Sequence, residues 1–168
     1  MSRAQALISE LDYEMATTRR MLERLPEARL AWQPHAKSMT LGRLGTHLAE
    51  IPRWGKRILA QDAYDLPPLG APRAEPATLG SRADILRSFD ESVAALRELL
   101  AAKSDEELKK PWSLLNRGAT LVTLPKGAAV RSMVLNHSIH HRGQLSVYLR
   151  LNDVPLPAVY GPTADEGI

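Results

Sequence analysis

The sequence contains no cysteine among its 168 residues. Disulfides, thiolate metal sites, iron–sulfur clusters and a cysteine nucleophile are therefore excluded, and any bound metal must be held by nitrogen or oxygen ligands. Aromatic residues are scarce as well, at 5% with a single Phe, so the core must consist mainly of Leu, Ala, Val, Ile and Met. Such a core favours packed helices over a sheet. The length suits one domain, which we expect to span residues 1–168.

Long apolar runs are also absent. No window approaches the roughly 18 apolar residues of a membrane span, and the N-terminus lacks the apolar core of a signal peptide. The sequence therefore predicts a cytoplasmic protein that makes no use of a membrane. The 22 Lys and Arg are offset by 19 Asp and Glu without any run of one sign, so nucleic acid is not expected as a partner. The net charge of +3 suits solubility or the attraction of small anionic substrates.

Four segments carry apolar residues at alternating steps of three and four, which is the pattern of an amphipathic helix. They extend over about residues 2–25, 38–60, 81–100 and 126–151. Ser38 or Thr40 can cap the second helix and Ser81 the third, because a side-chain oxygen there accepts from a free N–H group of the first turn. Gly42, Gly45, Pro52 and Gly55 weaken the second helix, so we expect a kink or close packing near Pro52.

Two long connections separate these helices. Residues 65–80 contain four Pro and two Gly, a composition typical of a connection rather than an element. Residues 104–125 are harder to assign, and a short strand or an extended loop is open for 119–124. The pattern predicts an all-α protein, a four-helix bundle with long crossover connections.

The histidines carry the strongest chemical signal. His137 and His141 are four residues apart on the fourth helix, so both imidazoles project from one face. His47 occupies a position in the apolar stripe of the second helix, where a buried imidazole needs partners for its nitrogens. A divalent metal ion shared by the three rings would satisfy all of them. Three neutral ligands would leave open positions for water or substrate.

Other interpretations of these residues stay open. The His pair could lie at the surface or be satisfied by hydrogen bonds in the core, and Ser138 stands where a zinc protease has glutamate. Glu50, three residues after His47, could orient a ligand, act as a base or be a solvated helix-face residue. His140 points away from the pair and is either an outer neighbour of the site or a surface residue, and Arg142 could pair or line a pocket.

Two blocks of sequence resemble a known family. The first comprises Trp32-Gln33-Pro34, Lys37–Leu44, His47–Glu50, Pro52 and Trp54. The second comprises Thr123–Lys126, Asn136–Gln144, Leu149-Arg150 and Tyr160–Glu166. On these blocks the sequence resembles the DinB-like family, also called DinB/YfiT-like metalloenzymes, over nearly the whole chain.

The resemblance implies a four-helix bundle that forms a homodimer. The family pattern has one His on the second helix and a His-x-x-x-His on the last, and these fall on His47, His137 and His141. Some relatives are metal-dependent thiol transferases or isomerases that use a low-molecular-weight thiol, whereas others have no assigned reaction.

The leading hypothesis is a metal-dependent enzyme with a three-His site for a divalent ion such as Zn, Ni or Fe. It would act as a thiol-dependent transferase or a hydrolase on small electrophilic substrates. The thiol would be a cosubstrate, because the chain has none of its own. The alternative is a non-enzymatic, stress-related module for metal binding or dimerisation.

Overall fold

The structure is a computed structural model that describes residues 1–67 and 77–167. The described helices are α1 (Arg3–Leu22), the 3-10 helix η1 (Glu27–Arg29), α2 (Leu41–Glu50), α3 (Pro52–Ala60), α4 (Arg82–Ala101), α5 (Asp105–Lys109), α6 (Lys126–Val130), the π-helix η2 (Arg131–Asn136) and α7 (His137–Arg150). The strands are β1 (Ala63–Leu66), β2 (Pro111–Asn116) and β3 (Ala119–Pro125).

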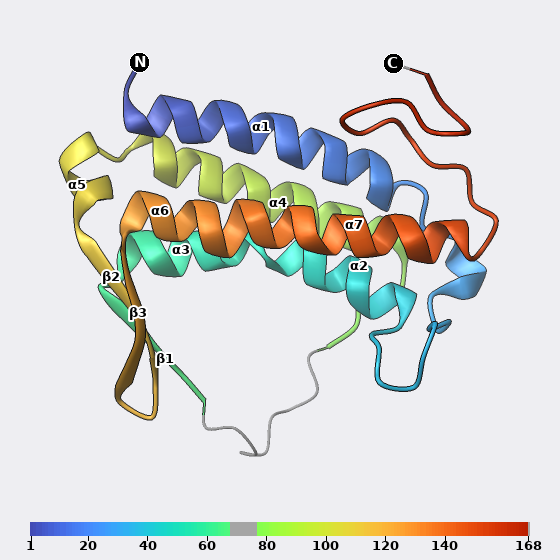
Figure 1. Ribbon diagram of the computed structural model, residues 1–168, viewed down its shortest axis with the longest axis horizontal. Helices are drawn as coiled ribbons and strands as arrows, with labels where there is room; N and C mark the ends of the chain where they lie inside the picture. The colour runs from blue at the N-terminus through green and yellow to red at the C-terminus, as the bar shows by residue number, and fades with distance from the viewer. Residues whose placement is uncertain (68–76, 168) are drawn as a thin grey trace.

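Four long helical segments lie side by side (Figure 1). They are α1, the pair α2–α3, α4, and the continuous run from α6 through η2 to α7. α1 contacts α4 and α7, while α2 and α3 contact α4 on one side and the α6–η2–α7 run on the other. The site described below lies where α2 meets α7.

The ends of these helices follow the capping rules. Ser2 forms a capping box with Gln5, and the side chains of Thr40 and Ser81 accept hydrogen bonds from the third residue of α2 and α4. The interruption expected at Pro52 is confirmed, because α2 ends at Glu50 and α3 begins at Pro52, where the missing N–H costs nothing.

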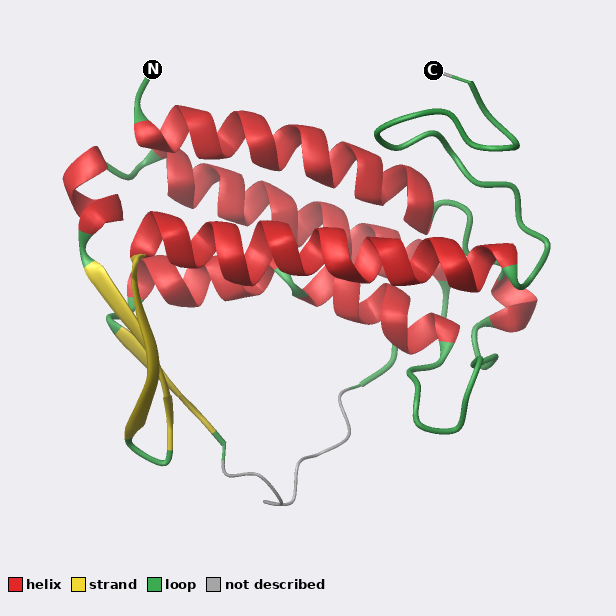
Figure 2. Cartoon of the chain, in the orientation of Figure 1, coloured by secondary structure: helices red, strands yellow, loops and turns green. Residues whose placement is uncertain are grey.

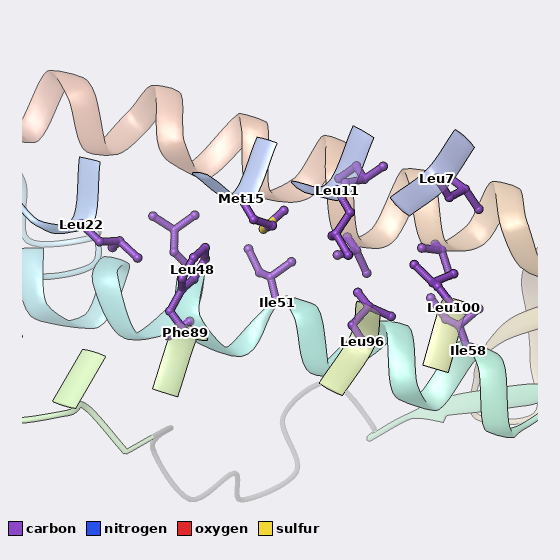
Figure 3. Close-up of a cluster of buried hydrophobic side chains, with 14 of the residues drawn as sticks. Leu7, Leu11, Met15, Leu22, Leu48, Ile51, Ile58, Phe89, Leu96 and Leu100 are labelled. Atoms are coloured by element: carbon purple, nitrogen blue, oxygen red, sulfur yellow. The ribbon is translucent and has the colours of Figure 1, made fainter. Parts of the chain in front are cut away.

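The core lies between the helical segments (Figure 3). Side chains of α1 point toward those of α4, and side chains of α2 and α3 fill the space between them. The residues labelled there are all buried: Leu7, Leu11, Met15, Leu22, Leu48, Ile51, Ile58, Phe89, Leu96 and Leu100. Apart from Phe89 they are aliphatic residues or Met, as the composition predicts.

The prediction of an all-α fold is wrong. Helices account for 58% of the described residues, but the structure also contains a three-stranded mixed sheet at one end of the helices, so the fold is of mixed α/β class (Figure 2). The strand order is β1-β2-β3, with β1 parallel to β2 and β2 antiparallel to β3. Of the two alternatives left open for residues 119–124, the strand is therefore the correct one.

The amino-acid composition did not predict the sheet because the sheet contributes little to the core. Its residues are exposed or half-buried except Trp112, so it needs few of the aromatic and β-branched residues that a buried sheet requires. The hairpin turns at Arg117 and Gly118, whose φ angles of 54° and 75° fit a two-residue turn of type I′. Asp65 of β1 accepts a hydrogen bond of 2.9 Å from the Gly118 N–H and thereby ties β1 to this turn.

The connection expected over residues 65–80 is corrected at its start. Residues 65 and 66 belong to β1, which pairs with a strand some fifty residues further along the chain. Residues 68–76 lie outside the described part of the structure. Within the described part, no helix combines the length and the apolar character needed to cross a membrane.

Candidate metal centre

The three predicted histidines meet at the contact between α2 and α7. His47 lies in the last turn of α2, and His137 and His141 lie on the first two turns of α7. α2 is placed by its buried side, which includes Leu44 and Leu48. His47 is at the margin of that buried side, so its ring faces the neighbouring helix rather than the centre of the core.

A π-helical segment immediately precedes His137. Residues Arg131–Asn136 form the wider π turn, whereas the sequence pattern predicted one regular helix from 126 to 151. The extra residue in the turn rotates the buried face, so Val134 and Leu135 are buried and Met133 lies at the margin. Because π turns occur frequently at functional sites, this placement supports a role for the histidines that follow.

The ring nitrogens of the three histidines form a small triangle. The Nε2 atom of His141 lies 2.9 Å from that of His137 and 3.1 Å from that of His47, and the His47 to His137 distance is 3.4 Å. The rings of His47 and His141 are nearly perpendicular, with centroids 4.4 Å apart. The three Nε2 atoms therefore converge on one point from two helices.

This triangle fits a divalent metal ion. Metal–nitrogen bonds of about 2.0–2.1 Å at tetrahedral angles place ligand nitrogens about 3.3 Å apart, and angles nearer 90° bring them to about 2.9 Å. The observed separations cover that range. Without an ion, the three Nε2 atoms could not all be hydrogen-bonded to one another, because a neutral imidazole has a single N–H to donate. The three histidines are thus a group that could hold a metal ion.

Hydrogen bonds on the far side of the rings orient two of these nitrogens. The Nδ1 atom of His141 lies 2.7 Å from Oε1 of Gln144, an acceptor, so Nδ1 carries the proton and Nε2 presents its lone pair to the centre. The His137 ring is hydrogen-bonded to the backbone of Met133 within the π turn. Such outer contacts fix ring orientation at metal sites.

The surroundings keep the rings neutral. Burial, together with the smaller effects of the His141 and His137 rings and of the Arg43 guanidinium, lowers the pKa of His47 from 6.5 to about 4. Burial also lowers the pKa of His137 and of His141, against the hydrogen bonds to Met133 and Gln144. Neutral imidazoles bind a metal ion without first releasing a proton.

These pKa shifts predict how the metal-free protein responds to acid. Below about pH 6.5 the unfolded chain protonates His47 while the folded chain does not, so the unfolded state binds more protons and stability falls as the pH drops toward 4. Thermal unfolding of the metal-free protein between pH 7.5 and 4.5 measures this. His47→Leu is expected to flatten the dependence over pH 6.5–4.5, and an unchanged slope in that variant would contradict the assignment.

The other predicted neighbours do not join the triangle. Glu50 is bound by Arg43, whose Nη1 and Nη2 atoms each donate to its Oε2 at 3.0 Å, so its carboxylate is neutralised by an arginine. His140 is exposed, with its ring edge toward His141 at a centroid distance of 4.8 Å. Arg43 was missed by the sequence argument, although its position four residues before His47 placed it on the same helix face.

Arg142 lies elsewhere, in a buried polar cluster. Its side chain forms an ion pair of 2.7 Å with Glu14, donates to the Glu14 carbonyl oxygen, and donates to the Tyr160 hydroxyl at 2.6 Å. The Tyr160 hydroxyl in turn donates to Glu14. Arg142 therefore joins α7, α1 and the C-terminal segment, and has a structural role.

The sequence profile of the DinB family matches residues 1–167. The chain belongs to the DinB family. A relative is the uncharacterised protein YrdA of Bacillus subtilis (strain 168), which is 25% identical over 157 residues covering 92% of this chain and 86% of YrdA.

Two solved DinB-like structures share the fold. One, from Bacillus cereus ATCC 10987, has a TM-score of 0.70 at 21% identity and covers 93% of this chain and 97% of its own. The other, YjoA of Bacillus subtilis, has a TM-score of 0.64 at 19% identity and covers 88% and 92%. Membership in the DinB family thus confirms the resemblance seen in the sequence.

Much of the second family-like block is structural in this DinB protein. Thr163 accepts hydrogen bonds from the backbone N–H groups of Asp165 and Glu166, and the two carboxylates pair with Arg150 and Arg20. These contacts hold the C-terminal segment against α1 and α7. Of this second block, His137 and His141 are the residues that belong to the candidate metal centre.

Proposed function

We propose that this DinB-family protein is a metal-dependent enzyme that uses His47, His137 and His141 to hold a divalent ion such as Zn, Ni or Fe. The observation that carries the proposal is the triangle of Nε2 atoms with sides of 2.9, 3.1 and 3.4 Å. Two of the three rings have hydrogen bonds on their outer side that turn Nε2 inward. A set of three imidazoles suits each of these metals.

The proposed reaction is transfer of a thiol, or of water, to a small electrophile. When bound by three protein ligands, a divalent ion keeps positions for exogenous ligands and lowers the pKa of a bound thiol or water. His47 and His137 are half-buried and His141 is buried, so the centre is approached from the side of the first two. The chain has no cysteine, so the thiol must be a second substrate of low molecular weight.

The open position can be tested with cobalt as the metal. Protein purified without an affinity tag and loaded with Co²⁺ is expected to show visible absorption bands that change on addition of N-acetylcysteine, with a new near-ultraviolet thiolate-to-cobalt band. The loaded protein should then accelerate the reaction of that thiol with 1-chloro-2,4-dinitrobenzene, and a chelator should abolish the acceleration.

Two results would contradict the proposal. A cobalt spectrum that is indifferent to thiol would mean a closed centre, and would favour the non-enzymatic metal-binding module. If a His47→Ala variant accelerated the reaction as much as the metal-loaded parent does, the reaction would not depend on the metal centre.

The hydrogen bond from His141 to Gln144 predicts an effect on metal affinity. Gln144→Leu removes the acceptor that holds the His141 proton on Nδ1, and metal affinity is expected to fall about 10–100-fold. Gln144→Glu, which keeps an acceptor oxygen, should retain the affinity. Competition titration with a chromogenic chelator measures both variants, and equal loss in the two would show that Gln144 does not act through this bond.

A further inference from the structure

The outer face of α3 carries three basic side chains beside two neighbouring hollows. Arg53, Lys56 and Arg57 are all exposed. A pocket of about 460 Å³ lies between α3 and α4 and is lined by all three, and a second pocket of about 220 Å³ is lined by Arg53 and Arg57 together with Glu50 and Trp54. Arg53 and Arg57 line both pockets.

Both guanidinium groups are held in place by uncharged neighbours. Arg57 stacks on the rings of Trp54 and Tyr64, with its Cζ atom 5.2 Å and 4.8 Å from their centroids, and these rings pack edge to face at 5.1 Å. Arg53 donates from Nη2 to the Ser88 hydroxyl at 2.8 Å. Stacking and a hydroxyl bond position an arginine without cancelling its charge.

The charge of this basic group is largely uncompensated. Over residues 1–67 and 77–167, no ion pair involves Arg53, Lys56 or Arg57, whereas Arg19 and Arg97 on the neighbouring surface pair with Asp90 and Asp12. Two carboxylates line the pockets. Glu50 is already neutralised by Arg43, and only Glu91 faces the larger pocket without an ion pair.

From these contacts we infer that Arg53, Lys56 and Arg57 form an anion site that binds the carboxylate or phosphate group of a small molecule. Two fixed guanidinium groups provide planar N–H donors that match such oxyanions, and the lysine adds a third charge. The site adjoins the metal centre through Glu50, which is three residues after His47. Arg53 follows His47 by six residues and lies on α3, beyond the end of α2.

The inferred site rests on the proposed function for one point only, namely that the bound anion is part of the substrate. A small acidic substrate with its reactive atom at the histidines could place a carboxylate or phosphate at these arginines. The anion binding itself depends on no metal.

Anion binding can therefore be measured on the metal-free protein. In ¹H–¹⁵N spectra, inorganic phosphate and, separately, malonate at constant ionic strength are expected to shift the Trp54 indole and the Arg53 and Arg57 Nε–H signals saturably. The variant Arg53→Gln/Arg57→Gln should weaken binding about tenfold or more. Arg19→Gln/Arg97→Gln, which removes two paired arginines, is the matched control and should bind as the parent does. Saturation by either anion supports the site and identifies its preferred group.

Other outcomes overturn the inference. Shifts that grow linearly with anion concentration, or that are equal in both double variants, would show general ionic effects only. Arg57→Lys, which keeps charge but loses the planar fork, provides a second folded variant and should bind more weakly than the parent. His47→Ala should bind phosphate normally, so loss of the metal centre and loss of the anion site remain distinguishable.

A kinetic comparison tests the link to the proposed reaction. With the carboxylate-bearing thiol N-acetylcysteine, Arg53→Gln/Arg57→Gln is expected to raise KM about tenfold and leave kcat nearly unchanged. With N-acetylcysteine amide, which lacks the carboxylate, the variant and the parent should have the same KM. An equal rise for both thiols would overturn the assignment of the site to the substrate.

Discussion

Protein carrying His141→Ala is expected to lose its bound metal almost entirely, from about one ion per chain to less than about one tenth. His141 is the most buried of the three histidines and has the two shortest Nε2 distances in the triangle, so its removal leaves only two ligand nitrogens, whose Nε2 atoms lie 3.4 Å apart. Loss of an outer hydrogen bond already costs about 10–100-fold in affinity, and loss of a ligand must exceed that. Plasma mass spectrometry of protein purified without an affinity tag gives the metal content.

His140→Ala is the matched control for this experiment. His140 neighbours His141 on the same helix, but it is exposed and lies outside the triangle, so its loss should leave one ion per chain within about 10%. His47→Ala should behave like His141→Ala, although it lies on another helix. Circular dichroism of each variant shows whether the fold persists. Normal metal content in folded His141→Ala would contradict the centre.

The candidate site could be predicted largely from helical periodicity. A spacing of four places His137 and His141 on one face, and His47 stood out because an imidazole occupied a position that the apolar pattern assigns to a core side chain. The orienting contacts were not predictable to the same degree. The hydrogen bond from His141 to Gln144 depends on a side-chain rotamer. The π turn before His137 cannot be recognised from the spacing of apolar residues, which still recur at steps of three and four.

The fold, too, could be predicted from the sequence only in part. The four long helical segments were predicted because each has an apolar stripe, and two of them begin after a capping residue, Thr40 or Ser81. The sheet has no such local basis. β1 is four residues long and gains its partner from β2, about fifty residues away, so its formation depends on tertiary contacts. The local sequence hints at the hairpin only through Gly118, because glycine readily adopts the positive φ that this turn requires.

The homodimer that the family resemblance implies is a prediction that can be measured. The exposed Val147 and Leu151, four residues apart on the last turns of α7 and just after it, are the place where a helix-mediated dimer would be sought first. Sedimentation of the parent and of Val147→Lys/Leu151→Lys would measure the oligomeric state of each.

Arg142→Met is expected to destabilise the protein by about 3–5 kcal/mol and to leave its metal content unchanged. Arg142 is 2% exposed and its partner Glu14 is 6% exposed, so the substitution leaves a carboxylate buried without its counter-charge. The Glu14 backbone oxygen and the Tyr160 hydroxyl also lose their guanidinium donor. Denaturation in urea gives the free energy of unfolding, and the metal content is measured on the same preparation.

The double variant Glu14→Leu/Arg142→Met separates the ion pair from simple packing. Replacing both partners with apolar residues of similar size removes the unpaired charge, so most of the stability lost in Arg142→Met should return. Tyr160→Phe, which removes one hydroxyl at the edge of the cluster, should cost only about 1 kcal/mol. If Arg142→Met instead kept its stability and lost its metal, Arg142 would belong to the centre. The buried contacts with α1 and Tyr160 point the other way, because they use the guanidinium to join three segments of the chain.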